Sequence, residues 1–203
     1  MIKAFENIDR SKLSPMMQHY LQTREENEGI IVFYRLGDFY EMFFDDAETV
    51  SRELEITLTG KDCGLEERAP MCGIPYHAAD TYIARLIQKG YKVAICEQVE
   101  DPKKAKGLVQ RKVIKIITPG TTMTEGTLTE DENNFICSII LRDGKYGIAT
   151  ADISTGQFMV TEVDQASKVL DEITKFEPSE IVTLEGQDLF PEDDLSTETY
   201  NML

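Results

Sequence analysis

The sequence predicts an α/β fold in which a mixed β-sheet flanked by helices is followed by a second, incomplete α/β unit. Runs of β-branched and aromatic residues alternate along the chain with segments of helical periodicity. A stretch poor in apolar residues, 121–134, separates two such regions. The chain has 203 residues, 41% of them hydrophobic, which is enough for one large domain or two small ones with real cores.

The first elements follow from capping and periodicity. Ser14 and Pro15 predict a helix start, because serine caps N-termini and proline is favoured at the first helical position. The β-branched and aromatic run 30–36 predicts a buried strand. Asp45 and Asp46 favour the N-terminus of a further helix, since acidic side chains suit the first turn. The remaining elements expected before residue 120 are strands at 55–59, 69–74, 91–99 and 113–118, a loop over 60–68 and an amphipathic helix at 77–89.

The domain organisation predicted from these patterns is a first domain at 1–120, a linker at 121–134 and a second domain at 135–203. In the second domain, Asp143-Gly144 is typical of a tight hairpin turn between two strands. The elements expected there are strands at 135–141, 146–153, 157–163 and 181–184 and a helix at 165–176, before a sparse acidic tail. We expect the remainder of this α/β domain to lie beyond Leu203.

Charge divides the chain in the same way. The net charge is −16, yet the basic residues are concentrated before residue 120. After it, the basic side chains are Arg142, Lys145, Lys168 and Lys175 alone. The first domain could therefore present a local basic face to a polyanion, whereas the second is expected to meet other proteins.

Composition also excludes several classes of protein. No apolar run approaches the roughly 18 residues of a membrane helix, and no secretory segment follows Met1. Cys63, Cys72, Cys96 and Cys137 form no CxxC pair, so a zinc site is not expected and reduced, buried thiols are. These features favour a cytoplasmic protein without membrane association.

Five motifs carry a resemblance that spans the whole chain. The segment Gly37-Asp38-Phe39-Tyr40-Glu41-Met42-Phe43, preceded by Ser14-Pro15-Met16-Met17-Gln18, closely resembles the mismatch-recognition domain of the bacterial MutS family. Residues 73–78 (GIPYHA), 94–98 (AICEQ, with Asp101-Pro102 after it), and 111–113 (RKV) leading to 118–121 (TPGT) match the same family. Residues 151–156 (ADISTG) resemble its connector domain, which implies a ribonuclease H-like fold.

The resemblance implies binding to double-stranded DNA that contains mismatches or small loops. Phe39 takes the role of the aromatic ring that enters the minor groove of kinked DNA and stacks on the mispaired base. Glu41 takes that of the acid that hydrogen-bonds the displaced base. Inserting an apolar wedge costs a few kcal/mol of unstacking, and least where pairing is already defective. In an intact duplex normal pairing occupies the base N–H that the carboxylate would bind, so only repulsion remains.

The resemblance also implies a homodimeric ATPase that uses Mg²⁺ and meets downstream repair proteins. No GxxxxGK[ST] loop occurs in the sequence, so we expect no ATP site, metal site or catalytic residue within these residues. The nucleotide site, the dimer interface and the DNA clamp are expected beyond Leu203.

Arg111, Lys61 and Arg35 are the candidate contacts to DNA phosphates. Phosphate contacts fix register without selecting sequence. Arg111 belongs to a matching motif, whereas Lys61 and Arg35 are candidates by position only. For the basic stretch Lys103, Lys104, Lys106, Arg111 and Lys112, both a solvated loop and contact with backbone phosphates remain open.

Pattern alone leaves other interpretations open. An aromatic residue after Gly-Asp is most often a core residue, and a lone glutamate an exposed charge. Tyr76-His77 could hold a phosphate at a helix start, although a structural turn is favoured. The acidic half favours an alternative function as a protein-interaction module without a DNA role. Asp152 could serve a divalent-metal nuclease, but it has no companion carboxylates and is interpreted as structural.

Overall fold

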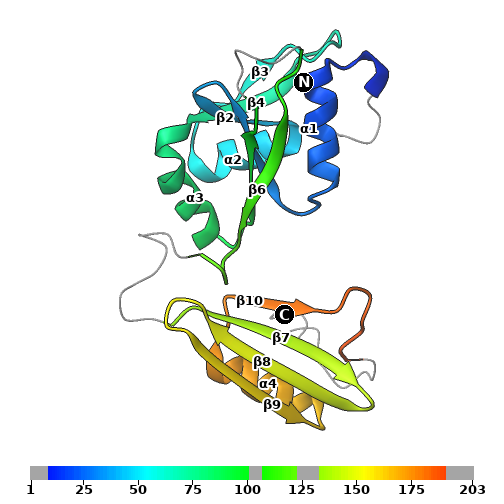
Figure 1. Ribbon diagram of the computed structural model, residues 1–203, viewed down its shortest axis with the longest axis vertical. Helices are drawn as coiled ribbons and strands as arrows, with labels where there is room; N and C mark the ends of the chain where they lie inside the picture. The colour runs from blue at the N-terminus through cyan, green and yellow to red at the C-terminus, as the bar shows by residue number, and fades with distance from the viewer. Residues whose placement is uncertain (1–8, 101–106, 123–132, 191–203) are drawn as a thin grey trace. The chain divides into compact units, whose positions relative to one another are not determined.

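The computed structural model describes residues 9–100, 107–122 and 133–190. The chain divides into two compact units, Met1–Thr118 and Pro119–Leu203 (Figure 1). No helix in the described ranges is long and apolar enough to cross a membrane.

The first unit is built on a six-stranded sheet with the strand order β3-β4-β2-β1-β5-β6. Strands β1 and β5 pair in parallel, while the other neighbours are antiparallel, so the sheet is mixed as predicted. Its strands are β1 (Ile31–Leu36), β2 (Phe39–Phe43), β3 (Thr59–Lys61), β4 (Ala69–Pro75), β5 (Val93–Gln98) and β6 (Arg111–Ile117).

Helices cover both faces of this sheet (Figure 1). Helices α2 (Phe44–Leu54) and α3 (Ala79–Gln88) pack on one face around Phe33, Met42 and Leu86. Helix α1 (Pro15–Glu25) packs on the other face with Tyr34 and Phe43. Arg10–Lys12 and Tyr76–Ala78 form single turns of 3₁₀ helix. The predicted capping of α1 is confirmed, because the Ser14 hydroxyl accepts a hydrogen bond from the Met17 N–H at 3.4 Å.

Asp46 connects three elements inside the first unit. The carboxylate, in the first turn of α2, accepts hydrogen bonds from the Tyr20 hydroxyl at 2.9 Å and the Val32 N–H at 3.0 Å. Arg24 Nε lies 2.8 Å from its other oxygen. Asp46 therefore ties α1, β1 and α2 together, and its burial raises the pKa of the carboxyl to about 6.

The second unit is a four-stranded sheet with the order β10-β7-β8-β9. Strands β7 (Phe135–Arg142), β8 (Lys145–Asp152) and β9 (Gln157–Val163) form an antiparallel meander, and β10 (Glu180–Thr183) pairs with β7 in parallel. The predicted hairpin turn is confirmed, with positive φ at both central residues, Asp143 (53°) and Gly144 (74°). Helix α4 (Ala166–Phe176) covers one face of the sheet through Val169 and Ile173 (Figure 1).

The strand predicted at 55–59 is wrong. Glu55 adopts a left-handed conformation (φ 57°) that ends α2, and its N–H donates to the Ser51 carbonyl. The strand β3 begins only at Thr59, where pairing with Met71 of β4 starts. The loop predicted over 60–68 consequently loses its first residues to this strand. The tail also differs, since Leu189 and Phe190 are buried in the core of the second unit.

Candidate nucleic-acid interface

Strand β2 alternates its side chains between the two faces of the sheet. Phe39 is 46% exposed, whereas Tyr40 is buried in the core beneath α2 and α3. Glu41 is half-buried. Phe39 and Glu41 therefore project from the face opposite Tyr40, the arrangement expected for an extended segment. An exposed phenylalanine next to a half-buried carboxylate is unusual on a strand whose other side chains are buried.

Gly73 of β4 lies between these two side chains. It is the partner of Glu41 in the β2–β4 ladder. A Cβ atom placed on Gly73 would lie 3.5 Å from Cγ of Glu41 and 3.8 Å from Cδ1 of Phe39. The absence of a side chain therefore leaves the space between the ring and the carboxylate open. We call Phe39, Glu41, Lys61 and Gly73 the β2–β4 surface.

Lys61 completes the β2–β4 surface from the edge strand β3. Its ammonium group donates a hydrogen bond to Oε2 of Glu41. Both side chains are largely shielded, with 32% of Lys61 and 16% of Glu41 exposed. The ammonium also lies 5.7 Å from the centre of the Phe43 ring. Lys61, predicted to contact phosphate, thus lies beside Glu41, predicted to contact the displaced base, and its positive charge offsets the charge of the carboxylate.

The turn that presents Phe39 is fixed from both sides. Gly37 has a φ of 59°, which the two-residue connection between β1 and β2 requires. The Tyr76 N–H donates to the Asp38 carbonyl at 3.0 Å and so attaches the turn to the end of β4. This attachment gives Tyr76 the structural role that the sequence favoured.

Arg35 lies on the opposite face of the sheet from Phe39. It is paired with the buried Tyr40 in the β1–β2 ladder and shares that residue's side. Its guanidinium stacks 3.7 Å from the centre of the Tyr76 ring and donates to Oε1 of Glu97 at 3.3 Å. Its Nε donates to the Gly37 carbonyl at 2.5 Å. The structure therefore separates Arg35 from the β2–β4 surface and engages it with the turn that leads to Phe39.

Arg111 is also engaged within the first unit. The residue is buried, at 7% exposure. Its Nε donates to the Arg35 carbonyl at 2.8 Å, and one terminal nitrogen donates to the Val109 carbonyl at 2.7 Å. The guanidinium carbon lies 5.0 Å from the centre of the Tyr34 ring. These contacts connect the start of β6 to the end of β1.

The basic stretch is described only in part. Lys103, Lys104 and Lys106 lie outside the described residues. Lys112, which follows Arg111 on the edge strand β6, is exposed. Of the predicted phosphate contacts, Lys61 is the one that forms an ion pair with Glu41.

Asp152 has a structural role at the end of β8. Oδ1 accepts hydrogen bonds from the Ser154 N–H and hydroxyl and from the Thr155 N–H, and Oδ2 accepts one from the Asn134 N–H. Although burial opposes it, this set of donors holds the pKa of Asp152 below its usual value. No cluster of three or more potential metal ligands occurs among the described residues.

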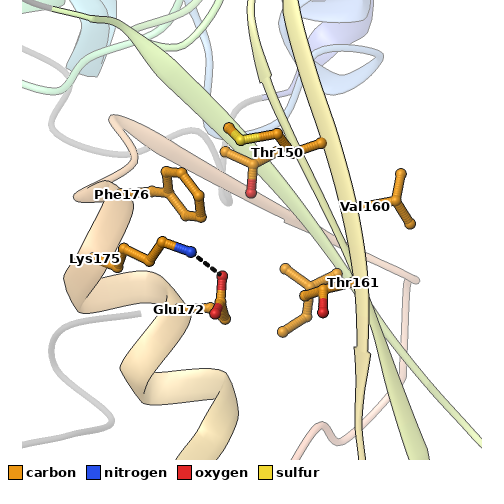
Figure 2. A pocket seen from close by; sticks show the side chains of 8 residues that line it. Thr150, Val160, Thr161, Glu172, Lys175 and Phe176 are labelled. Atoms are coloured by element: carbon orange, nitrogen blue, oxygen red, sulfur yellow. Dashed lines mark hydrogen bonds and ion pairs between the residues drawn. The ribbon is translucent and has the colours of Figure 1, made fainter.

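The second unit has a shallow pocket of about 150 Å³ between α4 and the β8–β9 ladder (Figure 2). Thr150, Thr161, Val160 and Phe176 are among the residues that line it. Its charged groups, Lys175 and Glu172, form an ion pair at 3.4 Å. The pocket thus combines threonine hydroxyls, apolar side chains and an ion pair whose charges cancel, and it is a weaker candidate than the β2–β4 surface.

Known protein families match both units. Residues 14–126 match MutS domain I, and residues 134–198 match MutS domain II. The chain belongs to the MutS family. All four residues of the β2–β4 surface lie in the part that matches MutS domain I. The mixed α/β folds of the two units agree with the fold class predicted for this family.

Curated MutS relatives are similar over most of this chain. The DNA mismatch repair protein MutS of Lachnoclostridium phytofermentans is 64% identical over 172 residues, which cover 85% of this chain and 18% of the relative. Its counterpart in Acetivibrio thermocellus is 61% identical over 175 residues (85% of this chain, 20% of the relative). That of Clostridium botulinum strain Eklund 17B is 56% identical over 192 residues (94% and 20%). The chain thus spans about a fifth of the length of these MutS relatives.

Sequence reasoning did not assign a role to Gly73, although it lies in one of the motifs that matched the MutS family. The sequence shows a single glycine within a strand-like segment, and such a glycine often marks a place where other atoms approach the backbone closely. The partner of that glycine could not be identified before the β2–β4 register was known.

Proposed function

We propose that this chain recognises mismatched or looped-out bases in double-stranded DNA and thereby takes part in DNA mismatch repair. One observation carries the proposal: Phe39 is exposed beside a neutralised carboxylate on a rigid strand, within the part that matches MutS domain I. The names of the relatives support the assignment to mismatch repair.

In the proposed mechanism, the Phe39 ring enters the minor groove at a weakened base step and stacks on the mispaired base. The unstacking this requires costs least where pairing is already defective. Base–aromatic stacking is worth roughly 1–3 kcal/mol, which corresponds to about 5- to 150-fold in affinity. Because Phe39 follows the fixed turn at Gly37, the backbone that carries the ring is positioned before DNA arrives.

Glu41 supplies the second part of the selection. In the proposal its carboxylate accepts a hydrogen bond from a base N–H that normal pairing would occupy. In a correctly paired duplex the partner base occupies that N–H, so the carboxylate gains no hydrogen bond to it. Deformability and an unpaired donor together, rather than base sequence, then determine binding.

The test replaces Phe39 with alanine in two proteins: this chain, and a full-length chimera. In the chimera, the matching region of the Lachnoclostridium phytofermentans MutS is replaced by the corresponding residues of this chain. Dissociation constants for a G·T duplex and a fully paired duplex are measured at one fixed salt concentration. We expect Phe39→Ala to reduce the G·T preference of the chimera to near unity.

Phe158→Ala is the matched control. Phe158 is a still more exposed phenylalanine, at 68%, on strand β9 of the second unit. We expect this variant to retain the preference. Equal G·T preference in the Phe39→Ala and unaltered chimeras would contradict the proposal, and undetectable duplex binding even at low salt would favour a protein-interaction module instead.

We propose further that the ATP and Mg²⁺ chemistry implied by the resemblance belongs to segments other than residues 1–203. Contacts with a second subunit and with downstream repair proteins are assigned to the longer protein in the same way. A calorimetric titration of this chain with ATP and Mg²⁺, expected to give no binding heat, tests the first assignment.

A further inference from the structure

We propose that Lys61 is a positioning residue for Glu41: its ammonium holds one carboxylate oxygen so that the other can accept a hydrogen bond from a displaced base. This inference rests on the proposed function. It assigns to Lys61 an effect on discrimination between matched and mismatched DNA, which a contact to phosphate does not provide.

The geometry of the ladder brings the two residues together. Lys61 is the last residue of the three-residue strand β3 and pairs with Ala69 of β4. Strand β4 separates β3 from β2, so the lysine side chain reaches across β4 to Glu41. Gly73, opposite Glu41, places no side chain in the space beside the carboxylate.

The hydrogen bonds of Glu41 are divided between its two oxygens. Oε2 accepts the bond from Lys61. Within the part of the chain that the structure describes, Oε1 accepts no hydrogen bond. One oxygen is therefore held by a cation while the other retains its capacity as an acceptor. A base imino or amino N–H is the chemical group that this oxygen would bind.

The positive charge of Lys61 also reduces the repulsion between Glu41 and the DNA phosphates. An unpaired carboxylate in the minor groove would be repelled by the phosphates of every duplex, whether matched or not. Because the pair is already largely shielded from water, DNA that covers it further would strengthen the attraction between its members. Lys61 thereby offsets the general repulsion and leaves the selective hydrogen bond.

The experiment is a double-mutant cycle in the full-length chimera. The four proteins are the unaltered chimera, Lys61→Met, Glu41→Ala and the double variant. Methionine retains most of the length of lysine without its charge. Affinities for G·T and paired duplexes are measured at several salt concentrations. We expect Lys61→Met to reduce the G·T preference roughly tenfold, the size of a lost hydrogen bond to a charged group.

In the Glu41→Ala background, we expect Lys61→Met to leave the remaining preference unchanged, because the group that it positions is gone. Lys61→Arg, which retains a donor and the charge, is expected to restore most of the preference. Lys112→Met removes one exposed charge from the same unit and serves as the control for general electrostatics.

Two results would overturn the inference. Lys61→Met could weaken binding to the G·T and paired duplexes by the same factor and reduce the slope of log affinity against log salt concentration by about one. Lys61 would then be a phosphate contact. If Lys61→Met increases the preference, the lysine sequesters Glu41 rather than positioning it. Either result, combined with loss of preference in Phe39→Ala, would leave the proposed function intact. A Phe39→Ala chimera that retains its preference contradicts the proposed function itself.

Discussion

Gly73 lies directly opposite Glu41 in the β2–β4 ladder, and the absence of a side chain there leaves the space between the carboxylate and the Phe39 ring open. The backbone of Gly73 does not need a positive φ, so the requirement here is for space. A small addition at this position meets atoms at ordinary contact distances, the nearest being the Tyr40 carbonyl at 3.4 Å.

Gly73→Val is therefore expected to impair recognition more than folding. Its two methyl groups would extend beyond the Cβ position into the space between Phe39 and Glu41, whereas Gly73→Ala adds only the Cβ. We expect valine to lower the G·T preference at least fivefold, a loss of about 1 kcal/mol as is common for overpacked sites. Alanine should lower it less than twofold. Equal preferences in both variants and the unaltered chimera would show that the space is not used.

Arg111→Met is expected to lower the free energy of unfolding rather than to weaken DNA binding directly. The substitution leaves the carbonyls of Arg35 and Val109 without their donors, which costs roughly 1–3 kcal/mol when such groups are buried. Lys112→Met, on the adjacent exposed position, should change the free energy of unfolding by less than about 0.5 kcal/mol. Urea denaturation of the chain measures both. Unchanged stability together with a lower salt slope of DNA binding would instead make Arg111 a phosphate contact.

The stability contributed by Asp46 is expected to increase as the pH falls from 7 to 5. Burial raises the pKa of this carboxyl to about 6 from an ordinary value of 3.8, so the folded state binds the proton more tightly than the unfolded state does. The stabilisation is complete below the unfolded value and is lost as the pH rises through the folded value. Relative to Asp46→Asn, the unaltered chain should gain about 1 kcal/mol between pH 7 and pH 5.

Urea denaturation of both proteins at the two pH values measures this difference. The asparagine side chain of the variant cannot titrate, so the comparison removes the contributions of all other groups that behave alike in the two proteins. A difference that shrinks towards pH 5 would contradict the prediction. It would show that the adjacent Arg24 outweighs burial and holds the carboxyl ionised.

The sequence predicted those elements whose signals are local. Capping at Ser14 and the Asp143-Gly144 turn each depend on a few adjacent residues, and the structure confirms both. The alternation that separates Phe39 from Tyr40 is equally local, since successive side chains of any strand face opposite sides. The strand expected at 55–59 failed because the left-handed conformation of Glu55 and the pairing of β3 with β4 are not local properties.

The candidate site was predictable in part for the same reason. Phe39 and Glu41 lie two residues apart on one strand, so motif and alternation identify them together. Arg111 was a candidate because it lies in a matching motif and Arg35 by position only, but the partners of both lie far away in sequence. Arg111 donates to a carbonyl 76 residues distant, and Arg35 to a glutamate 62 residues distant. Only the register of the assembled sheet shows that these cations are engaged within the protein.

Gly120→Ala is expected to destabilise the second unit selectively. An added Cβ would lie 2.9 Å from Cβ of Glu180 and 3.1 Å from Cβ of Ile136, so β10 or β7 must shift, at a cost of about 1–3 kcal/mol. Hydrogen exchange should therefore accelerate first in β10 and its partner β7. Gly144→Ala is the comparison, because it separates backbone strain from a steric clash. The φ of Gly144, 74°, would strain the β7–β8 turn, but no atom lies within 4 Å of the added Cβ. Exchange in β10 that is unchanged by Gly120→Ala would show that this glycine does not pack on Glu180.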